Sequence, residues 1–355
     1  MQWLRDAYRG KRVLVTGHTG FKGSWLTIWL KELGAEVTGY ALDPWTPRDN
    51  FVVSGISDSI YDVRGDIRDN DRLFKVFAEY RPEIVFHLAA RAWVLDCYKH
   101  PKETYDVNVG GTVNILDNCR FSDSVKSVII VTSDKCYDDN LRNGGRFGGY
   151  RENDHLGGLD PYSSSKACAE LVTAAYRASF LNDKGLATVR AGNVIGGGDW
   201  CAHRIVPDCI RALEAGIPIR VRNPLASRPW QYVLEPLAGY LLLGARLIEN
   251  PSAYSEAWNF GPADDSIIRV RDLVELILEY WGDGTWEAVG ETNTPYEAAF
   301  LALNSHKAET KLGWRPRLNI QDAVRQTVAW YKRQKKDQDR SALCLDQIRT
   351  YMGHL

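Results

Sequence analysis

Three glycines spaced three residues apart constrain the fold of this 355-residue chain more than any other feature. Gly17, Gly20 and Gly23 lie between the apolar run RVLVTG and the amphipathic stretch FKGSWLTIWLKELG, which are typical of a buried strand and a helix. In that position the first glycine permits a tight turn, the second lets backbone N–H groups approach a pyrophosphate, and the third lets the helix pack closely. The pattern predicts a dinucleotide-binding loop.

Short apolar runs alternate with amphipathic stretches through residues 11–131, which is the pattern of βαβ units in a parallel sheet. After residue 190 the alternation becomes irregular. We therefore predict an α/β fold, a Rossmann-type doubly wound parallel sheet with a smaller, mixed α/β substrate-binding lobe near the C-terminus. The expected domains are residues 1–190 with returning segments at about 229–262 for NAD binding, 191–228 and 263–335 for the lobe, and 336–355 for a C-terminal tail.

Composition predicts a soluble cytoplasmic protein. With 44 basic and 45 acidic side chains, the net charge of -1 attracts neither nucleic acid nor an anionic membrane. The longest apolar stretch, PLAGYLLLGARL (236–247), is shorter than the roughly 20 residues that span a bilayer, and the N-terminus lacks the apolar core of a signal peptide. The seven cysteines form no C-x-x-C pair, so neither a disulfide framework nor a metal site is predicted.

Asp43 is the residue expected to determine whether NAD or NADP binds. It ends the next predicted strand, 20 residues after Gly23. A carboxylate in this place accepts hydrogen bonds from the adenosine ribose hydroxyls, and its negative charge favours NAD over NADP. The alternative is an ordinary surface carboxylate beside Pro44.

Tyr162 and Lys166 are the candidates for redox chemistry. They open the helical stretch YSSSKACAELVTAAYRASF, one turn apart on one face. A lysine ammonium held there stabilises the phenolate and lowers the pKa of the tyrosine, which becomes a usable base for an alcohol proton. Such a pair also occurs by chance, but behind a dinucleotide loop it indicates a redox site.

An acid and a base, Asp134 and Lys135, follow directly on the apolar run VIIV (128–131). Two opposite charges at a strand end can be a surface pair, which contributes about 0 to 1 kcal/mol and says little about function. The alternative is a catalytic acid and base at the strand end where a ligand would bind.

The segments GHTGFKG, TSDKCY and GGLDPYSSSKACAELV resemble the extended short-chain dehydrogenase/reductase family, and within it the sugar-nucleotide 4,6-dehydratases. The TSDK and GGGDW segments are most similar to the subgroup that acts on CDP-glucose, and the resemblance extends from about residue 10 to about 335. It implies that bound NAD oxidises C4 of the hexose, that water is eliminated across C5 and C6, and that the hydride returns to C6. Such enzymes serve deoxysugar biosynthesis, including that of lipopolysaccharide O-antigen.

The resemblance also implies residue roles. In the reaction, Ser133 would orient the C4 oxygen, Tyr162 take its proton, Lys166 hold the phenolate and the nicotinamide ribose, Asp134 protonate the leaving hydroxyl, and Lys135 assist at C5. Further cofactor contacts would be His18, Thr19, Phe21 and Lys22 in the glycine loop, Asp66 and Ile67 beside the adenine, and Leu88, Ala89 and Ala90 after a later strand. Substrate contacts would be Asn193, Gly197, Arg204 and Arg228.

Three alternatives stay open. A 4-epimerase would use the same loop, Tyr162 and Lys166, but has no use for an acid at position 134. A dehydratase for a different nucleotide-hexose is suggested by departures from the subgroup, Arg91-Ala92 where Gln-Pro is usual and Tyr232 where histidine is common. A non-catalytic NAD-sensing protein would have lost the tyrosine or the lysine.

The resemblance finally implies an assembly. Relatives pair through two helices, which we place near 103–120 and 162–180. We therefore expect a homodimer with a four-helix interface, possible pairing into a tetramer, a nucleotide-sugar substrate, and no nucleic-acid or membrane partner.

Overall fold

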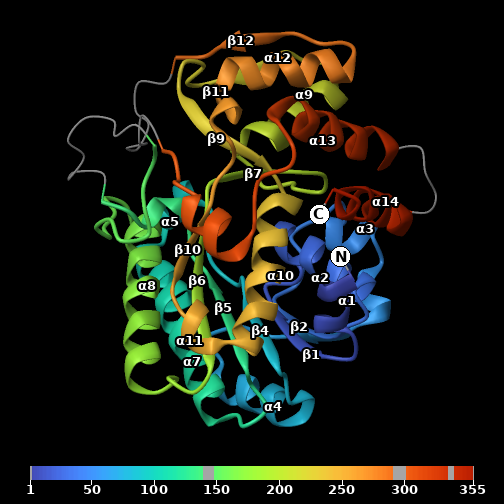
Figure 1. Ribbon diagram of the computed structural model, residues 1–355. Coiled ribbons are helices and arrows are strands. Elements are labelled where there is room, and N and C mark those ends of the chain that lie inside the picture. The colour runs from blue at the N-terminus through green and yellow to red at the C-terminus, as the bar shows by residue number, and fades with distance from the viewer. Residues whose placement is uncertain (1, 139–147, 291–300, 335–339, 355) are drawn as a thin grey trace.

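A parallel seven-stranded sheet forms the centre of the molecule (Figure 1). The computed structural model describes residues 2–138, 148–290, 301–334 and 340–354. The strands lie in the order β10-β6-β5-β4-β1-β2-β3, and each neighbouring pair is parallel. They are β1 (Arg12–Thr16), β2 (Glu36–Ala41), β3 (Tyr61–Arg64), β4 (Ile84–His87), β5 (Ser127–Val131), β6 (Gly185–Ala191) and β10 (Ala257–Phe260). The predicted Rossmann-type sheet is confirmed.

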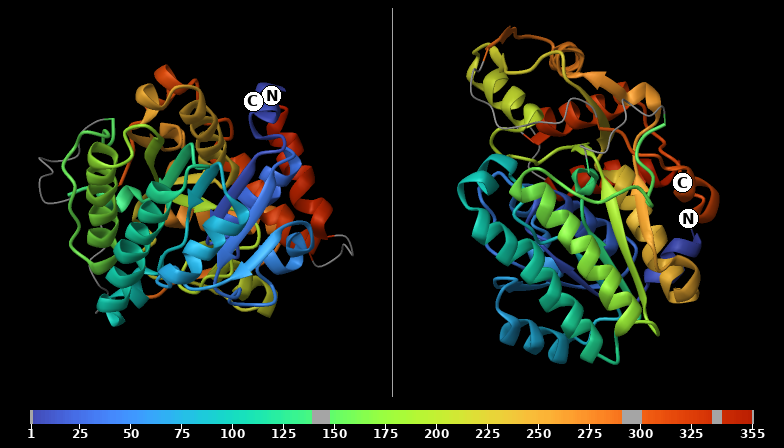
Figure 2. Two further views of the ribbon diagram at one scale, coloured as in Figure 1. Left: turned by 90° about the horizontal axis from the view of Figure 1, so that it is seen from below. Right: turned by 90° about the vertical axis from the view of Figure 1, so that its left-hand side faces the viewer.

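Helices cover both faces of this sheet because successive strand residues point to opposite sides. Val13 and Val15 of β1 pack into one core, and Leu14 between them packs into another. The first core lies under α1 (Gln2–Tyr8), α2 (Phe21–Glu32) and α10 (Leu234–Glu249). The second lies under α4 (Asn70–Tyr80), α7 (Gly111–Phe121) and α8 (Pro161–Ser179), and Figure 2 shows α7 and α8 side by side. Short helices complete this part: α3 (Asn50–Val53), α5 (Val94–Lys99), α6 (Pro101–Tyr105), the π-helix η2 (Asp106–Gly110) and α11 (Pro251–Tyr254).

The apolar stretch 236–247 lies inside α10, which packs against β5 and β6. All its leucines except the partly buried Leu242 are buried, because the helix is covered by the sheet on one side and by α1 on another. Within the described ranges, the helices all lack the combination of length and apolar character that a bilayer crossing requires.

A smaller lobe sits at the carboxyl end of the sheet. Strand β6 runs through Gly192 directly into β7 (Asn193–Ile195), which pairs with β9 (Ser227–Tyr232). Strand β11 (Ile267–Arg269) completes this sheet, and β8 (Ile219–Val221) pairs with β12 (Trp286–Ala288). The lobe helices are α9 (Ile205–Ala215), α12 (Val270–Trp281) and α13 (Ile320–Gln334). A ligand crevice is expected between such a lobe and the strand ends.

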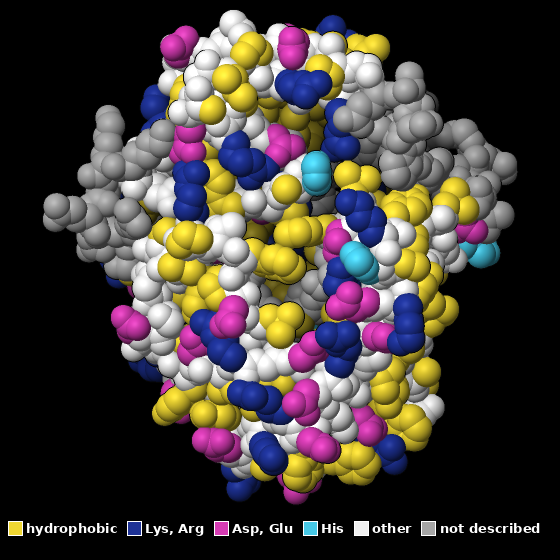
Figure 3. Space-filling model, turned by 180° about the vertical axis from the view of Figure 1, so that it is seen from behind, with side chains coloured by type: hydrophobic (Ala, Val, Ile, Leu, Met, Phe, Trp, Pro, Cys, Tyr) yellow, Lys and Arg dark blue, Asp and Glu magenta, His cyan; other side chains and the backbone are white. Residues whose placement is uncertain are grey.

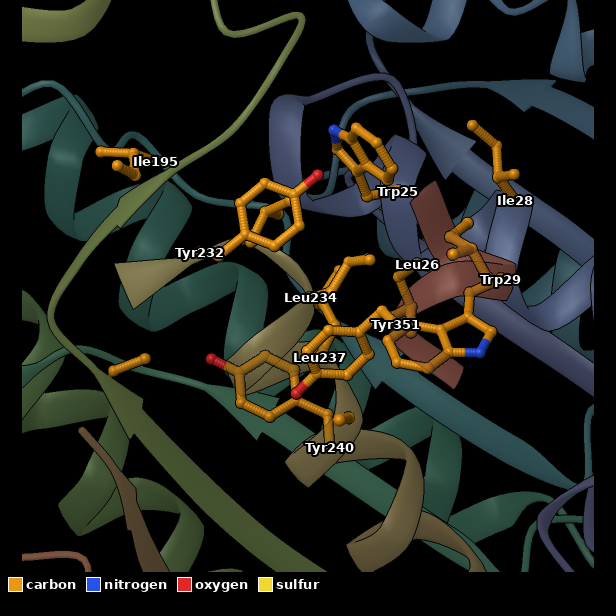
Figure 4. Close-up of a cluster of buried hydrophobic side chains, with 14 of the residues drawn as sticks. Trp25, Leu26, Ile28, Trp29, Ile195, Tyr232, Leu234, Leu237, Tyr240 and Tyr351 are labelled. Atoms are coloured by element: carbon orange, nitrogen blue, oxygen red, sulfur yellow. The ribbon is translucent and has the colours of Figure 1, made fainter. Parts of the chain in front are cut away.

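The expected C-terminal tail at 336–355 needs correction, because residues Arg340–Met352 form helix α14, which packs against α2. Tyr351 lies edge-on to Trp29 with 5.7 Å between ring centroids, and the Tyr232 hydroxyl donates to Gln347 Oε1 at 2.7 Å. Figure 4 shows these aromatic side chains gathered between α2, α10 and the C-terminal helix. Tyr232 therefore points into the core, and its departure from the subgroup pattern is explained by packing against α14.

Candidate active site

The tripeptide Ser133-Asp134-Lys135 lies where β5 ends and turns into the short 3-10 helix η3 (Asp134–Cys136). The Ser133 hydroxyl donates to Asp134 Oδ1 at 3.0 Å and accepts from the Lys135 backbone N–H at 3.2 Å. Asp134 is only 4% exposed. The interpretation as an ordinary surface ion pair is therefore wrong, because the acid of the pair is buried at the strand end.

The carboxyl of Asp134 is suited to carry a proton. Burial raises the pKa of Asp134, although Lys135, Ser133 and Lys22 act in the opposite direction. Among the residues that the structure describes, nothing hydrogen-bonds its buried Oδ2. A protonated carboxyl with one unused oxygen can donate a proton to a hydroxyl placed beside it.

Tyr162 stands at the start of α8, next to Ser133. Asp160 caps the helix, since its Oδ1 accepts from the backbone N–H groups of Tyr162 at 2.8 Å and Ser163 at 3.0 Å. Burial raises the pKa of Tyr162 to about 12, and a hydrogen bond with Ser133 only partly opposes this. Burial thus outweighs the lowering predicted from Lys166, whose ammonium donates to the carbonyl oxygen of Val131 at 3.0 Å.

Cationic side chains from three parts of the chain meet around Asp134. Burial, followed by repulsion from Lys166 and Arg204, lowers the pKa of Lys22 to about 8, while Asp134 opposes the shift. Burial likewise lowers the pKa of Lys166 to about 8. Arg204 is held by Asp199, with 2.9 Å between Nη1 and Oδ2. Cations gathered in this way suit an anionic ligand such as a nucleotide diphosphate. Figure 3 shows that this molecule is hollowed between lobe and sheet on the face opposite to that of Figure 1.

The glycine loop has the geometry predicted for it. Gly17 has a φ of +74°, and a Cβ added there would lie 2.7 Å from the backbone nitrogen of Ala89. A Cβ on Gly23 would lie 2.1 Å from the Gly17 carbonyl oxygen, whereas a Cβ on Gly20 would meet only that same oxygen at 3.3 Å. The first and third glycines are thus required for packing, and the second leaves the backbone open to a phosphate.

The other side chains of the glycine loop point in different directions. The His18 ring is buried against Phe51 and lies 2.8 Å from Asp62 Oδ1, so its side chain faces the core and leaves only its backbone to a phosphate. The Thr19 hydroxyl donates to the Leu42 carbonyl oxygen at 3.0 Å, and the Phe21 ring packs beside Gly196.

The remaining predicted cofactor residues follow the strands next to β1. Asp43 is 86% exposed after β2, with Oδ1 3.7 Å from Arg64 Nε. Asp66 pairs with Arg68 at 2.6 Å, and Ile67 is buried against Gly111. The run Leu88-Ala89-Ala90 lies half-buried after β4. Since these strands are neighbours in the sheet, all of these residues lie at one edge with the glycine loop.

Of the four predicted substrate residues, the structure brings Arg204 to the charged cluster, and the other three lie in or next to the strands of the lobe. Asn193 begins β7 opposite Trp230 of β9, and Arg228 is buried in β9. Gly197 stays a predicted substrate residue, and packing explains why it has no side chain, because a Cβ there would lie 2.0 Å from the Trp330 ring. Its carbonyl oxygen accepts from Trp25 Nε1 at 2.9 Å, so packing explains this glycine.

Comparison with known proteins shows the family of this chain. The model of the NAD dependent epimerase/dehydratase family matches residues 13–259. The chain belongs to the NAD dependent epimerase/dehydratase family. The family is NAD dependent, in agreement with the cofactor predicted from the glycine loop and Asp43.

Relatives within the epimerase/dehydratase family narrow the comparison. The chain is 46% identical over 357 residues to the CDP-glucose 4,6-dehydratase of Salmonella typhimurium, with 98% of both chains covered. It is 25% identical over 339 residues to the dTDP-D-glucose 4,6-dehydratase of Mus musculus, covering 91% of this chain and 89% of that protein. The chain is thus a homologue of sugar-nucleotide 4,6-dehydratases.

Solved structures of the family share the fold. The crystal structure of dTDP-glucose 4,6-dehydratase from Bacillus anthracis in complex with NAD has a TM-score of 0.77 at 22% identity, covering 94% of this chain and 100% of that chain. UDP-glucose 4-epimerase from Thermotoga maritima has a TM-score of 0.76 at 22% identity, covering 92% and 100%. Dehydratases and epimerases of the family share one fold, so side chains must separate the two reactions.

Two residues behind the site, Glu170 and Arg190, were not predicted from the sequence. Arg190 lies in the otherwise uncharged strand GLATVRA, and Glu170 lies four residues after Lys166 on the same helix. A charged residue within a buried strand needs a partner of opposite charge. That rule was the available signal for this pair.

Proposed function

We propose that this protein catalyses the NAD-dependent 4,6-dehydration of a nucleotide-hexose, converting CDP-D-glucose to CDP-4-keto-6-deoxy-D-glucose in deoxysugar biosynthesis. The observation that carries the proposal is the buried carboxyl of Asp134, whose raised pKa and unbonded Oδ2 suit a general acid beside Ser133 and Tyr162. The similarity to the Salmonella enzyme supports CDP-glucose as the substrate.

The residues present fit the cofactor. Gly20 leaves an open approach to the loop backbone, and Asp43 is exposed at the end of β2. Bound NAD would accept the hydride from C4 and later return it to C6. In the first half of the reaction Ser133 orients the C4 hydroxyl, and the phenolate of Tyr162, stabilised by Lys166, takes its proton and becomes a neutral phenol.

The residues at the end of β5 carry out the second half of the reaction. A ketone at C4 acidifies the C5 hydrogen; Lys135 takes this proton and returns it to C5 when the hydride adds to C6. Asp134 donates its proton to the C6 hydroxyl, which leaves as water. Lys22 and Arg204 hold the diphosphate of the nucleotide-sugar by charge.

An epimerase does not need this acid. A 4-epimerase rotates the ketone intermediate and returns the hydride to C4, so a buried carboxyl with a raised pKa at position 134 would have no step to serve. A non-catalytic sensor would not need Tyr162 and Lys166 together at the end of β5. The side chains therefore favour dehydration over both alternatives.

We extend the proposal to assembly and location. Phe121 at the end of α7 and Leu171 and Phe180 along α8 are exposed apolar side chains on the predicted pairing helices. They support a homodimer through a four-helix interface, because burying them would remove apolar surface from water. All seven cysteines lie in described segments and are free thiols, which supports a reducing cytoplasm.

The test is to incubate the purified protein with NAD and CDP-, dTDP-, GDP- and UDP-hexoses and to follow product mass. Loss of one water from CDP-glucose is expected for wild type, and Asp134→Asn should abolish it. Asp123→Asn, at an exposed position after α7, is the matched control and should keep wild-type activity. An altered stereocentre at unchanged mass, or no reaction with any donor, would contradict the proposal.

A further inference from the structure

A buried ion pair joins α8 to β6 directly behind the end of β5. The Glu170 carboxylate and the Arg190 guanidinium are each 3% exposed, with 2.8 Å between Oε2 and Nη2. A second hydrogen bond of 2.9 Å runs from Arg190 Nε to Glu170 Oε1, so the pair is bidentate. Burial opposes ionisation, but Arg190 lowers the pKa of Glu170 below its usual value, so the carboxylate is charged.

The same pair holds both flanks of the tripeptide Ser133-Asp134-Lys135. The Thr132 hydroxyl, on the residue before Ser133, donates to Glu170 Oε1 at 2.5 Å. On the other side, Arg190 Nη1 donates to the Tyr137 hydroxyl at 2.7 Å, two residues after Lys135. The segment that carries the acid is therefore attached at both ends to one buried charge pair.

The Tyr137 end of this attachment is itself rigid. Its ring stacks on that of Tyr150 with 4.5 Å between centroids and 2° between planes. Its hydroxyl donates to Asn259 Oδ1 at 2.8 Å, and the Asn259 amide nitrogen donates to the Tyr150 carbonyl oxygen at 2.8 Å. A movement of Arg190 would thus be transmitted to the β5 end and not absorbed by a loose side chain.

Glu170 also shares a helix with the redox residues. It lies four residues after Lys166 and eight after Tyr162, so all three occupy the same face of α8. One ion pair therefore connects the element that carries Tyr162 and Lys166 with the segment that carries Asp134 and Lys135. Ion pairs in an interior give little net stability, because desolvation offsets their attraction. A role in geometry explains this pair better than a role in stability.

We propose that Glu170 and Arg190 are positioning residues that set the placement of Asp134 and Lys135 relative to Tyr162 and Lys166, and so match the elimination step to the oxidation step. This inference rests on the proposed dehydratase function. Neither residue needs to touch the substrate, because each acts through a flank of the tripeptide. Misplacement of reacting groups by about 1 Å costs on the order of 100-fold in rate.

The test uses Thr132→Val, which removes one attachment but leaves the ion pair intact, together with Glu170→Gln. In both variants elimination should slow more than oxidation, so reduced cofactor should accumulate during turnover while overall kcat falls about 10- to 100-fold. KM for CDP-glucose should stay within about twofold, because the cations that hold the diphosphate are unchanged.

Two further variants separate positioning from stability. Glu235→Gln is the matched control, since Glu235 is a buried carboxylate that accepts several hydrogen bonds but lies on α10 away from the tripeptide. It should show no accumulation of reduced cofactor. The double variant Glu170→Met with Arg190→Met removes both buried charges, so its unfolding midpoint should be higher than that of Glu170→Gln and close to that of wild type. Its elimination step should still be slower relative to oxidation than in wild type.

Each outcome decides between explanations. Accumulation of reduced cofactor in Thr132→Val and Glu170→Gln, and not in Glu235→Gln, supports the positioning role. If wild type is active and the variants keep its balance of steps, differing only in unfolding midpoint, the pair is structural and this inference fails alone. If wild type dehydrates no donor, the proposed function fails and this inference fails with it.

Discussion

The ammonium nitrogen of Lys166 lies 3.0 Å from the carbonyl oxygen of Val131, so the side chain bonds α8 to the strand that carries the proposed acid. Val131 is the last residue of β5, two residues before Ser133. Lys166 is therefore part of the scaffold as well as a partner for the tyrosine. Its substitution should affect both the phenolate and the spacing between helix and strand.

Lys166→Met should lower the rate of substrate oxidation about 100- to 1,000-fold, because the phenolate of Tyr162 would lose its nearby cation. Single-turnover formation of reduced cofactor measures this step. The matched control is Lys184→Met, since Lys184 also donates to backbone carbonyl oxygens, those of Cys119 and Ser122, but away from the site. Equal effects of the two substitutions would contradict a specific role for Lys166.

The tyrosine should not ionise near neutral pH in the protein without ligands. Because burial raises the pKa of Tyr162 to about 12, its phenol should stay protonated throughout the range below about pH 10. Ultraviolet difference titration of wild type and Tyr162→Phe should therefore coincide in that range. A tyrosine ionisation near pH 7 that disappears in Tyr162→Phe would show that the pKa of Tyr162 is not raised.

Substitution of the second and third glycines of the loop should separate an effect on stability from an effect on NAD binding. Gly23→Ala places a Cβ 2.1 Å from the Gly17 carbonyl oxygen, so it should lower stability by about 1 to 3 kcal/mol. Gly20→Ala meets only one backbone oxygen at 3.3 Å and should leave the unfolding midpoint nearly unchanged. It should nevertheless weaken NAD binding at least about tenfold, because the methyl group lies where the pyrophosphate approaches. Calorimetric titration with NAD and thermal unfolding measure the two effects.

Glu235 should make stability depend on pH. Burial raises its pKa from 4.5 to about 7, although hydrogen bonds from Tyr351, Leu318 and Arg317 oppose the shift. Between these values the folded protein keeps a proton that the unfolded chain has lost, so the free energy of unfolding should fall as pH rises from about 4.5 to about 7. The loss should be on the order of 3 kcal/mol.

Urea unfolding at about pH 5 and about pH 8 checks this expectation, with Glu235→Gln as the comparison. The variant has no titrating group at this position, so its midpoint should change less between the two pH values than that of wild type. A wild-type unfolding midpoint that rises with pH relative to that of the variant would exclude a raised pKa of Glu235.

Local patterns were sufficient to predict the sheet and the glycine loop. The spacing of Gly17, Gly20 and Gly23 and the apolar runs around them describe contacts between residues close in sequence, and the structure confirms them. Helix α14 was missed because its partners lie far away: Arg349 pairs with Glu32, and Tyr351 with Glu235. Its packing depends on contacts that no window of the sequence contains.

The sequence predicted which residues form the site better than it predicted how they are placed. Residues from the loop, β5, α8 and the lobe do meet, as the mutual effects of Lys22, Lys166, Arg204 and Asp134 show. The raised pKa of Tyr162 and the hydrogen bond from Lys166 to Val131 were not predicted, because spacing along a helix does not report how deeply a hydroxyl is buried. The packing of Gly197 against the ring of Trp330, 133 residues later, could not be foreseen from the sequence.

The packing of α14 on α2 has a consequence for synthesis on the ribosome. Helix α2 is among the first elements to emerge, and Trp29 on it is covered by Tyr351, more than 300 residues later (Figure 4). The edge strand β10 of the central sheet is likewise completed only at residue 260. During translation the nascent chain therefore exposes an aromatic surface for most of its elongation, and we expect chaperones that bind apolar segments to engage it until the C-terminal helix has left the ribosomal tunnel.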